Sequence, residues 1–116
     1  MSGVNGMKAE QFQVKQEETQ NQIILHVSGE LDLSVVPQLR AALEPVMNRE
    51  DKALILNLKH LKYIDSTGIG IIVSVLKLRD ELKAPFFVRD IPSAVKRLFD
   101  ITGISRYLIE GTEAQA

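Results

Sequence analysis

The fold of this chain is decided by residues 53–70, ALILNLKHLKYIDSTGIG. The six residues Ala53–Leu58 are almost all apolar, which is the pattern of a short strand covered on both faces. Asp65 and Ser66 follow, and the apolar periodicity after them predicts a helix from Ser66 to about Lys83. Strands that alternate with helices in this way indicate an α/β fold with a mostly parallel sheet.

The segment before this stretch predicts an antiparallel hairpin. Phe12–Lys15 alternates apolar with polar residues, which suits an edge strand with one solvent-exposed face. Ile23–Val27 predicts a second strand, and the polar residues Glu17–Asn21 between the two predict a turn.

A first helix should follow this hairpin. Asp32 and Ser34 are potential caps, and Pro37 is tolerated in a first helical turn because the N–H that proline lacks would be unpaired there anyway. Pro45 denies a hydrogen bond to Ala41, so we expect the helix to bend or end near residue 45.

The C-terminal third predicts a strand, a helix and a last short strand. The strand is Pro85–Val88, and the helix starts at Pro92-Ser93 and ends with Gly103 in the C-cap position. Tyr107–Ile109 is the candidate last strand. The sequence therefore predicts a single α/β domain with a mixed, mostly parallel sheet, an N-terminal antiparallel hairpin and packed helices.

Composition limits the function classes. The chain has 116 residues, a formal net charge of −1 and 45% apolar residues, which suits one compact domain, expected at residues 12–110 between flexible tails at 1–11 and 111–116. The charge argues against nucleic acid as the main partner. The lack of cysteine excludes disulfides and zinc–thiolate sites, and no apolar run is long enough to span a membrane. We expect a small cytoplasmic protein.

Ser66 is the residue with the clearest chemical potential. It stands at a predicted helix start, where backbone N–H groups lack intrahelical partners and the helix dipole favours negative charge. Such a position can hold a phosphate, and a serine can carry one covalently. The alternative is that Ser66 is an ordinary helix N-cap.

Catalytic interpretations of this motif have little support. No G-x-S-x-G surrounds Ser66, and the two histidines, His26 and His60, fall in or at the end of predicted strands. The Asp-Ser-Thr-Gly sequence is also similar to an aspartic protease loop, but those enzymes need two such loops and this chain has one. Glycines 68 and 70 match no nucleotide-binding motif, and no carboxylate has a histidine at ligand spacing. We expect no catalytic residue, metal or cofactor.

The predicted helix after Ser66 is apolar on two sides. Ile69, Ile72, Val73 and Leu76 form one stripe, and Ile71, Val75, Leu78 and Leu82 form a second on roughly the opposite side. Either the helix is deeply buried, or the second stripe is available to a partner.

Three motifs resemble, in order, those of the STAS domain family, which includes the bacterial anti-sigma factor antagonists. They are Gly29–Asp32 with Pro37 after it, Leu56–Leu58 with Tyr63–Gly68 after it, and Arg97–Gly103. The resemblance extends from about Phe12 to Ile109. Ser66-Thr67 and the run Leu-Phe-Asp-Ile-Thr-Gly are more similar to the general stress-response type than to the sporulation type.

The resemblance implies regulation by partner switching. In this family the unmodified antagonist binds an anti-sigma factor that is also a serine kinase, and the sigma factor is released for transcription. The kinase uses ATP and magnesium to phosphorylate the motif serine, here Ser66, and the complex dissociates. A metal-dependent serine phosphatase restores the active form.

The expected partner-binding surface surrounds this serine. It comprises Asp32, Asp65, Ser66, Thr67, Gly68, Ile71 and Val75, with Thr67 as a second candidate phosphate acceptor. Neither nucleic acid nor membrane is expected as a partner. The alternative function is a STAS interaction subunit of another complex, in lipid transport or a signalling scaffold, without a phosphorylation switch. A small serine hydrolase is a third hypothesis, which predicts labelling of Ser66 by a fluorophosphonate.

Overall fold

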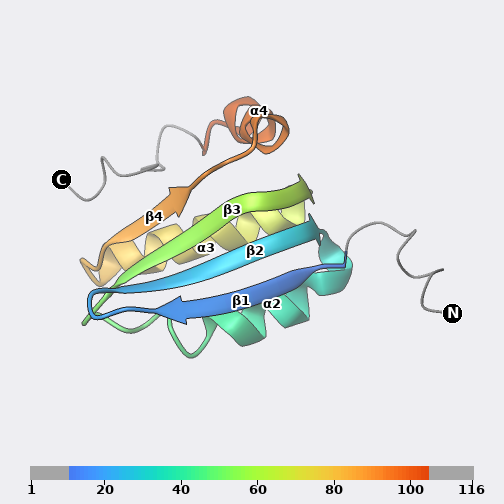
Figure 1. Ribbon diagram of the computed structural model, residues 1–116. Helices are drawn as coiled ribbons and strands as arrows, with labels where there is room; N and C mark the ends of the chain where they lie inside the picture. The colour runs from blue at the N-terminus through green and yellow to red at the C-terminus, as the bar shows by residue number, and fades with distance from the viewer. Residues whose placement is uncertain (1–10, 105–116) are drawn as a thin grey trace, which may run out of the picture.

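The computed structural model describes residues 11–104, and these form a four-stranded sheet with strand order β1-β2-β3-β4 (Figure 1). Strand β1 (Gln13–Glu18) pairs antiparallel with β2 (Gln22–Leu31). Strands β3 (Ala53–Ile64) and β4 (Phe86–Arg89) are then added in parallel. The predicted fold class is confirmed: the sheet is mixed and mostly parallel, and it begins with an antiparallel hairpin.

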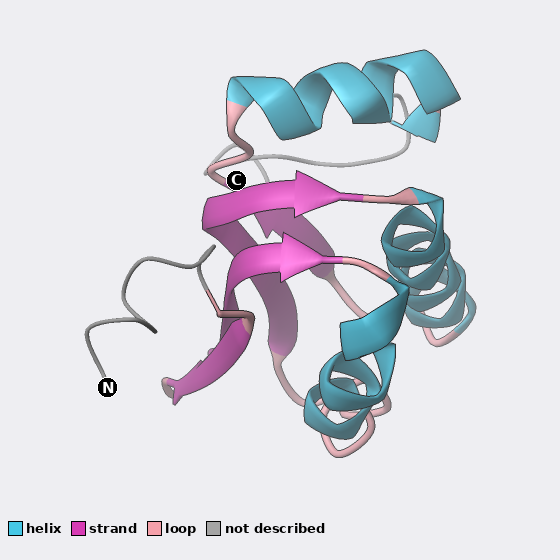
Figure 2. Ribbon diagram, turned by 90° about the vertical axis from the view of Figure 1, so that its right-hand side faces the viewer, coloured by secondary structure: helices cyan, strands magenta, loops and turns pink. Residues whose placement is uncertain are grey.

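The helices lie mainly on one side of this sheet. A short 3₁₀ helix, η1 (Leu33–Val35), leads into α2 (Val36–Leu43), and α2 and α3 (Ser66–Glu81) cover the same face (Figure 2). Helix α4 (Ser93–Thr102) lies beside β3, beyond the end of the short strand β4 (Figure 1). None of these helices is long and apolar enough to cross a bilayer, in the part of the chain that the structure describes.

The core lies between the sheet and its helices. Alternate residues of the central strands point into it, because successive side chains of a strand face opposite sides. β2 contributes Ile23, Leu25 and Val27, and β3 contributes Leu54, Leu56 and Leu58, while the helices contribute Leu39, Leu43, Ile69, Ile72, Val95 and Phe99. All twelve are buried, so burial of these side chains fixes the register of the strands and the position of α3.

Strand β3 is longer than the sequence predicted. It was expected to end at Leu58 but continues to Ile64, with two register shifts against β2. Each shift places one extra residue in β3, and the Asn57 side chain supports the first by accepting a hydrogen bond from the Lys59 N–H at 2.9 Å. Such bulges break the two-residue alternation from which strands are predicted.

A buried arginine joins the segments that precede β3 and β4. Arg79 of α3 is 1% exposed, and its guanidinium donates to the carbonyl oxygens of Met47, Arg49, Lys52 and Pro85. Burial lowers the pKa of Arg79 from its ordinary value. The sequence did not indicate that this residue is buried.

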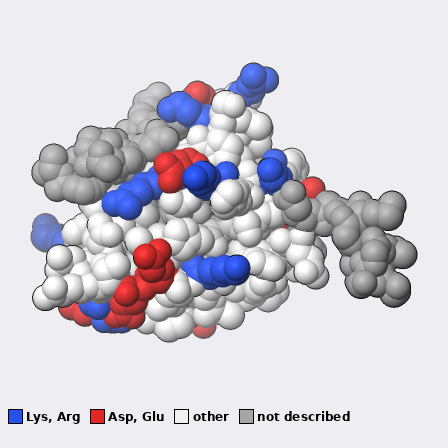
Figure 3. Space-filling model, in the orientation of Figure 1, with Lys and Arg blue, Asp and Glu red and all other residues white. Residues whose placement is uncertain are grey.

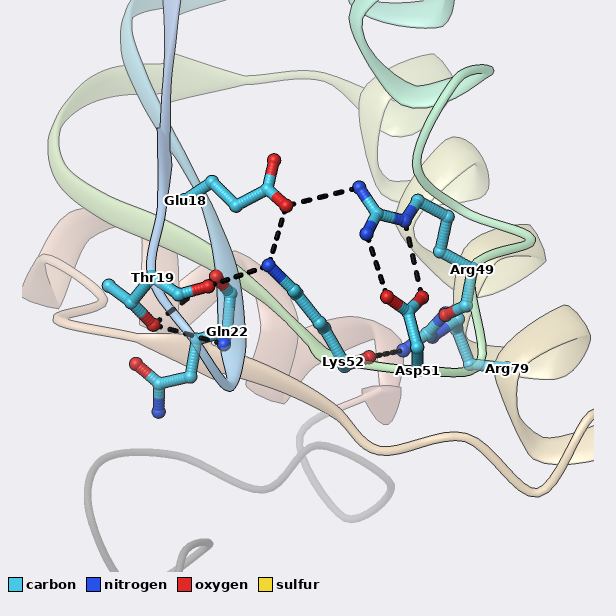
Figure 4. Close-up of polar contacts among 7 residues, drawn as sticks. All are labelled: Glu18, Thr19, Gln22, Arg49, Asp51, Lys52 and Arg79. Carbon is cyan, nitrogen blue, oxygen red and sulfur yellow. Dashed lines mark hydrogen bonds and ion pairs between the residues drawn. The ribbon is translucent and has the colours of Figure 1, made fainter.

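Ion pairs surround the same loops at the surface. Lys52 Nζ lies 2.6 Å from Glu18 Oε2, and Arg49 pairs with Asp51 at 2.7 Å (Figure 4). The hydrogen bond from Lys52 holds the pKa of Glu18 below its usual value, and that from Arg49 does the same for Asp51. These contacts join the β1–β2 turn to the segment before β3.

The other predicted elements are confirmed with shifted ends. β1 extends to Glu18, so the turn is shorter than predicted, and β4 is Phe86–Arg89 rather than Pro85–Val88. Helix α2 ends at Leu43, in agreement with the effect expected of Pro45. Gly103 caps α4 with a φ of 83°, as predicted. The predicted strand Tyr107–Ile109, the C-terminal tail and most of the N-terminal tail lie outside the described residues.

Candidate functional site

The candidate site lies where two parallel strands end side by side. Leu31, the last residue of β2, pairs with Ile64, the last residue of β3. The N–H of Asp65 donates to the carbonyl oxygen of Leu31 at 3.1 Å. The two connections that follow, into η1 and into α3, therefore start side by side at the carboxyl-terminal ends of β2 and β3. Figure 2 views this end of the sheet.

Asp65 joins these two connections through its carboxylate. One oxygen, Oδ1, accepts a hydrogen bond from the Gly68 N–H at 3.0 Å, so Asp65 is the N-cap of α3. The other, Oδ2, accepts one from the Leu33 N–H at 3.2 Å. A single side chain thus caps one helix and holds the start of another.

Asp32 occupies the corresponding position in the first connection. Its Oδ1 accepts hydrogen bonds from the Ser34 N–H at 3.0 Å and from the Ser34 hydroxyl at 2.6 Å, so it caps η1. Because Asp32 follows Leu31 and Asp65 follows Ile64, the strand pairing brings both carboxylates to the same edge. Two carboxylates are thus held at the end of the sheet from which α3, with Ser66 as its first residue, begins.

Ser66 and its neighbours differ in accessibility. Ser66 is the first residue of α3 and is exposed, whereas Thr67 is half-buried. Gly68 is buried, and a Cβ placed on it would lie 2.8 Å from the Leu31 Cγ and the Ile64 Cγ1. The motif therefore leaves Ser66 exposed, while Gly68 lets the helix pack against the strand ends.

Three residues expected at the partner-binding surface are in the interior instead: Gly68, Ile71 and Val75. Ile71 is 5% exposed and Val75 is 2% exposed, and both belong to the hydrophobic core. The second apolar stripe of α3 faces α2, where Leu43 and Met47 line the same small groove of about 250 Å³. Of the two readings of this helix, burial is the one observed, and neither side chain offers a surface to a docked partner.

The two histidines lie in strands, away from the helix start. His26, in β2, has its Nε2 at 2.9 Å from Glu17 Oε1, and His60, in β3, is opposite Ser28. Within residues 11–104 no hydrogen bond links Ser66 to either histidine. No group of three or more side chains in that range could hold a metal ion.

Charged side chains are mixed on the sheet face opposite α2 and α3. Figure 3 shows Lys and Arg interspersed with Asp and Glu over this face. It therefore presents no broad basic surface of the kind that phosphate backbones require.

Two further residues at the site, Leu33 and Gly70, were not predicted from the sequence to have a role there. Leu33, held by Asp65, is 67% exposed, although it is a large apolar residue. Gly70 lies in the second turn of α3 and is exposed, with no atom within 4 Å of the position a Cβ would take. A leucine after a cap and a glycine after a motif are too ordinary to be singled out without the structure.

Comparison with family models and with known protein sequences finds clear relatives of this chain. The model of the STAS domain family matches residues 13–116. An anti-sigma-B factor antagonist of Staphylococcus aureus is 34% identical over 91 residues, which is 77% of this chain and 84% of the relative. A Staphylococcus epidermidis protein of the same name is 35% identical over the same coverage.

Solved structures share the fold. An anti-sigma factor antagonist from Mycobacterium paratuberculosis superposes with a TM-score of 0.75 at 22% identity, covering 86% of this chain and 85% of that one. The antagonist SpoIIAA in its unphosphorylated form gives 0.70 at 22% identity, with 90% and 91% covered. SpoIIAA in its phosphorylated form gives 0.65 at 21% identity, with 90% and 95% covered.

Proposed function

Because the chain belongs to the STAS domain family, we propose that it is an anti-sigma factor antagonist that is switched off by phosphorylation of Ser66. In its unmodified form it binds an anti-sigma factor with serine kinase activity, and a sigma factor is released for transcription. The observation that carries this proposal is the exposed Ser66 at the start of α3, directly after Asp65 and at the strand ends that also carry Asp32.

The position of Ser66 suits a phosphate within the free domain. The first N–H groups of a helix have no intrahelical acceptor, and the dipole at that end favours negative charge. The Gly68 N–H is already taken by Asp65, but the dipole of the sixteen-residue helix α3 remains. We expect the phosphorylated chain to keep its fold.

The same phosphate would act strongly on a bound partner. It adds a charge of about −1.5 to −2 next to Asp65, at the end of the sheet that also carries Asp32. Like charges placed at an interface, together with the desolvation of the phosphate, cost several kcal/mol, and each ~1.4 kcal/mol is tenfold in affinity. One modification of an otherwise unchanged surface is then sufficient to dissolve the complex.

Mass spectrometry of the chain after incubation with the cognate kinase, ATP and Mg²⁺ tests this proposal. We expect one phosphate, on Ser66, because Thr67 is half-buried whereas Ser66 is exposed. The chain offers a matched pair of variants: Ser66→Ala should abolish incorporation and Thr67→Ala should leave it in place. Incorporation that survives Ser66→Ala would contradict the choice of residue.

The remaining parts of the cycle belong to the same proposal. A metal-dependent serine phosphatase would return the chain to its binding form, and both steps take place in the cytoplasm, where sigma factors act. Stress response is the setting that the names of the Staphylococcus relatives suggest.

The second candidate is a STAS interaction subunit that binds its partner without modification. It is favoured by the buried Gly68 and the N-cap of Asp65, which would serve packing alone. The two functions differ in one measurement: a chain that binds its partner but takes up no phosphate from it belongs to the second.

A further inference from the structure

The two glycines of the Asp65–Gly70 motif have different physical explanations. Gly68 is required by the fold, since a side chain there would collide with Leu31 and Ile64. Gly70 has no such reason: it is exposed, its helix continues to Glu81, and the space around a Cβ is open. A glycine inside an exposed helix is less stable than alanine, because it loses more backbone freedom on folding. The free domain would gain from alanine at this position.

Leu33 is a second residue whose side chain does not stabilise the free domain. Its side chain is 67% exposed, and its backbone N–H is held by Asp65 Oδ2. The apolar side chain is therefore kept in solvent on an anchored backbone, at the same edge as Ser66. An exposed apolar group that is already ordered loses less entropy on binding than a mobile one.

We propose that Leu33 and Gly70 are the contact residues through which the anti-sigma factor kinase recognises the Ser66 end of the domain. Leu33 enters an apolar pocket of the kinase, and the missing side chain at Gly70 lets a kinase segment approach α3 directly. Residues four apart lie on the same side of a helix, so a side chain at 70 would stand beside the Ser66 hydroxyl. This inference rests on the proposed function and adds to it the means of recognition.

The experiment is a calorimetric titration of purified cognate anti-sigma factor with the unphosphorylated chain and its variants. Gly70→Ala should raise the thermal midpoint by roughly 2–6 °C and yet weaken binding. Gly70→Gln, with a longer side chain, should weaken binding at least about tenfold, as should Leu33→Ser. The midpoint of Leu33→Ser should stay close to that of the wild type, because its side chain is exposed.

Two matched control variants test whether the loss of binding is specific to positions 33 and 70. Ala41→Gln places the same side chain on an exposed position of α2, and Ile101→Ser removes another exposed apolar residue, 74% accessible, from α4. Both should bind like the wild type. Losses in these controls as large as those at positions 33 and 70 would overturn the inference.

The outcomes separate this inference from the function on which it rests. If the wild-type chain fails to bind the anti-sigma factor, the proposed function is wrong. If the wild type binds and both Gly70→Gln and Leu33→Ser bind equally well, the function stands and the inference fails.

Discussion

The carboxylate of Asp65 accepts a hydrogen bond from the backbone N–H of Leu33, which lies thirty-two positions earlier in the chain. The same carboxylate caps α3 through the Gly68 N–H. Asp65, the residue before Ser66, therefore holds both the start of α3 and the start of η1. Ser66 follows directly after this anchored residue.

Replacing Asp65 should separate these two roles. Asp65→Ala removes both hydrogen bonds, so we expect a loss of about 1–3 kcal/mol in the free energy of unfolding, from the cap and the link to Leu33 together. Asp65→Asn keeps one oxygen for the cap but turns an NH₂ group towards the Leu33 N–H. It should lose only about 0.5–1.5 kcal/mol. Urea denaturation measures both, and an Asn variant as stable as the wild type would show that the link to Leu33 contributes nothing.

The glycines at 68 and 70 should respond to alanine in opposite directions. Gly68→Ala should destabilise the domain by about 1–3 kcal/mol, since its Cβ would lie 2.8 Å from two buried side chains. Gly70→Ala should stabilise it by about 0.5–1 kcal/mol, because the added methyl meets nothing. Thermal unfolding of the two variants side by side tests the packing, and equal shifts would be incompatible with it.

Arg79 should be one of the most sensitive positions in the domain. Arg79→Met removes hydrogen bonds to four carbonyl oxygens, of which that of Pro85 still accepts from the Leu54 N–H, and we expect a loss of about 3 kcal/mol or more in the free energy of unfolding. Arg79→Lys keeps the charge but cannot reach all four acceptors, so its loss should be smaller. A surface control, Lys77→Met on the same helix, should change stability by less than about 0.5 kcal/mol.

Much of the fold could be predicted because its signals are local. The buried strand at Ala53–Leu58, the helix from Ser66 and the glycine cap at Gly103 each follow from short-range patterns, and all three are present. The extension of β3 to Ile64 was missed because its two bulges destroy the alternation of apolar residues. Loop and strand ends depend on pairing with a neighbour, which a single sequence does not contain.

The candidate site could be predicted only in part, because some of its features follow from local patterns and others depend on packing. Ser66 can be identified from the motif, although the N-cap of α3 is Asp65 and not Ser66 itself, the alternative that the sequence left open. Parallel strands imply that Asp32 and Asp65, which follow β2 and β3, lie at the same end of the sheet. The orientation of α3 cannot be derived in this way, because its two apolar stripes are chemically equivalent in the sequence. Ile71 and Val75 were placed on the surface, whereas packing against α2 buries them.

The most direct test of the central claim is the affinity of the anti-sigma factor for the chain with and without phosphate on Ser66. We predict that phosphorylation weakens binding at least about 100-fold, and that Ser66→Asp binds weakly while Ser66→Ala binds like the unmodified chain. A negative residue in the first helical turn is favourable, so Ser66→Asp should remain folded, which circular dichroism can verify. Equal affinities for the phosphorylated and unphosphorylated chains would contradict the account.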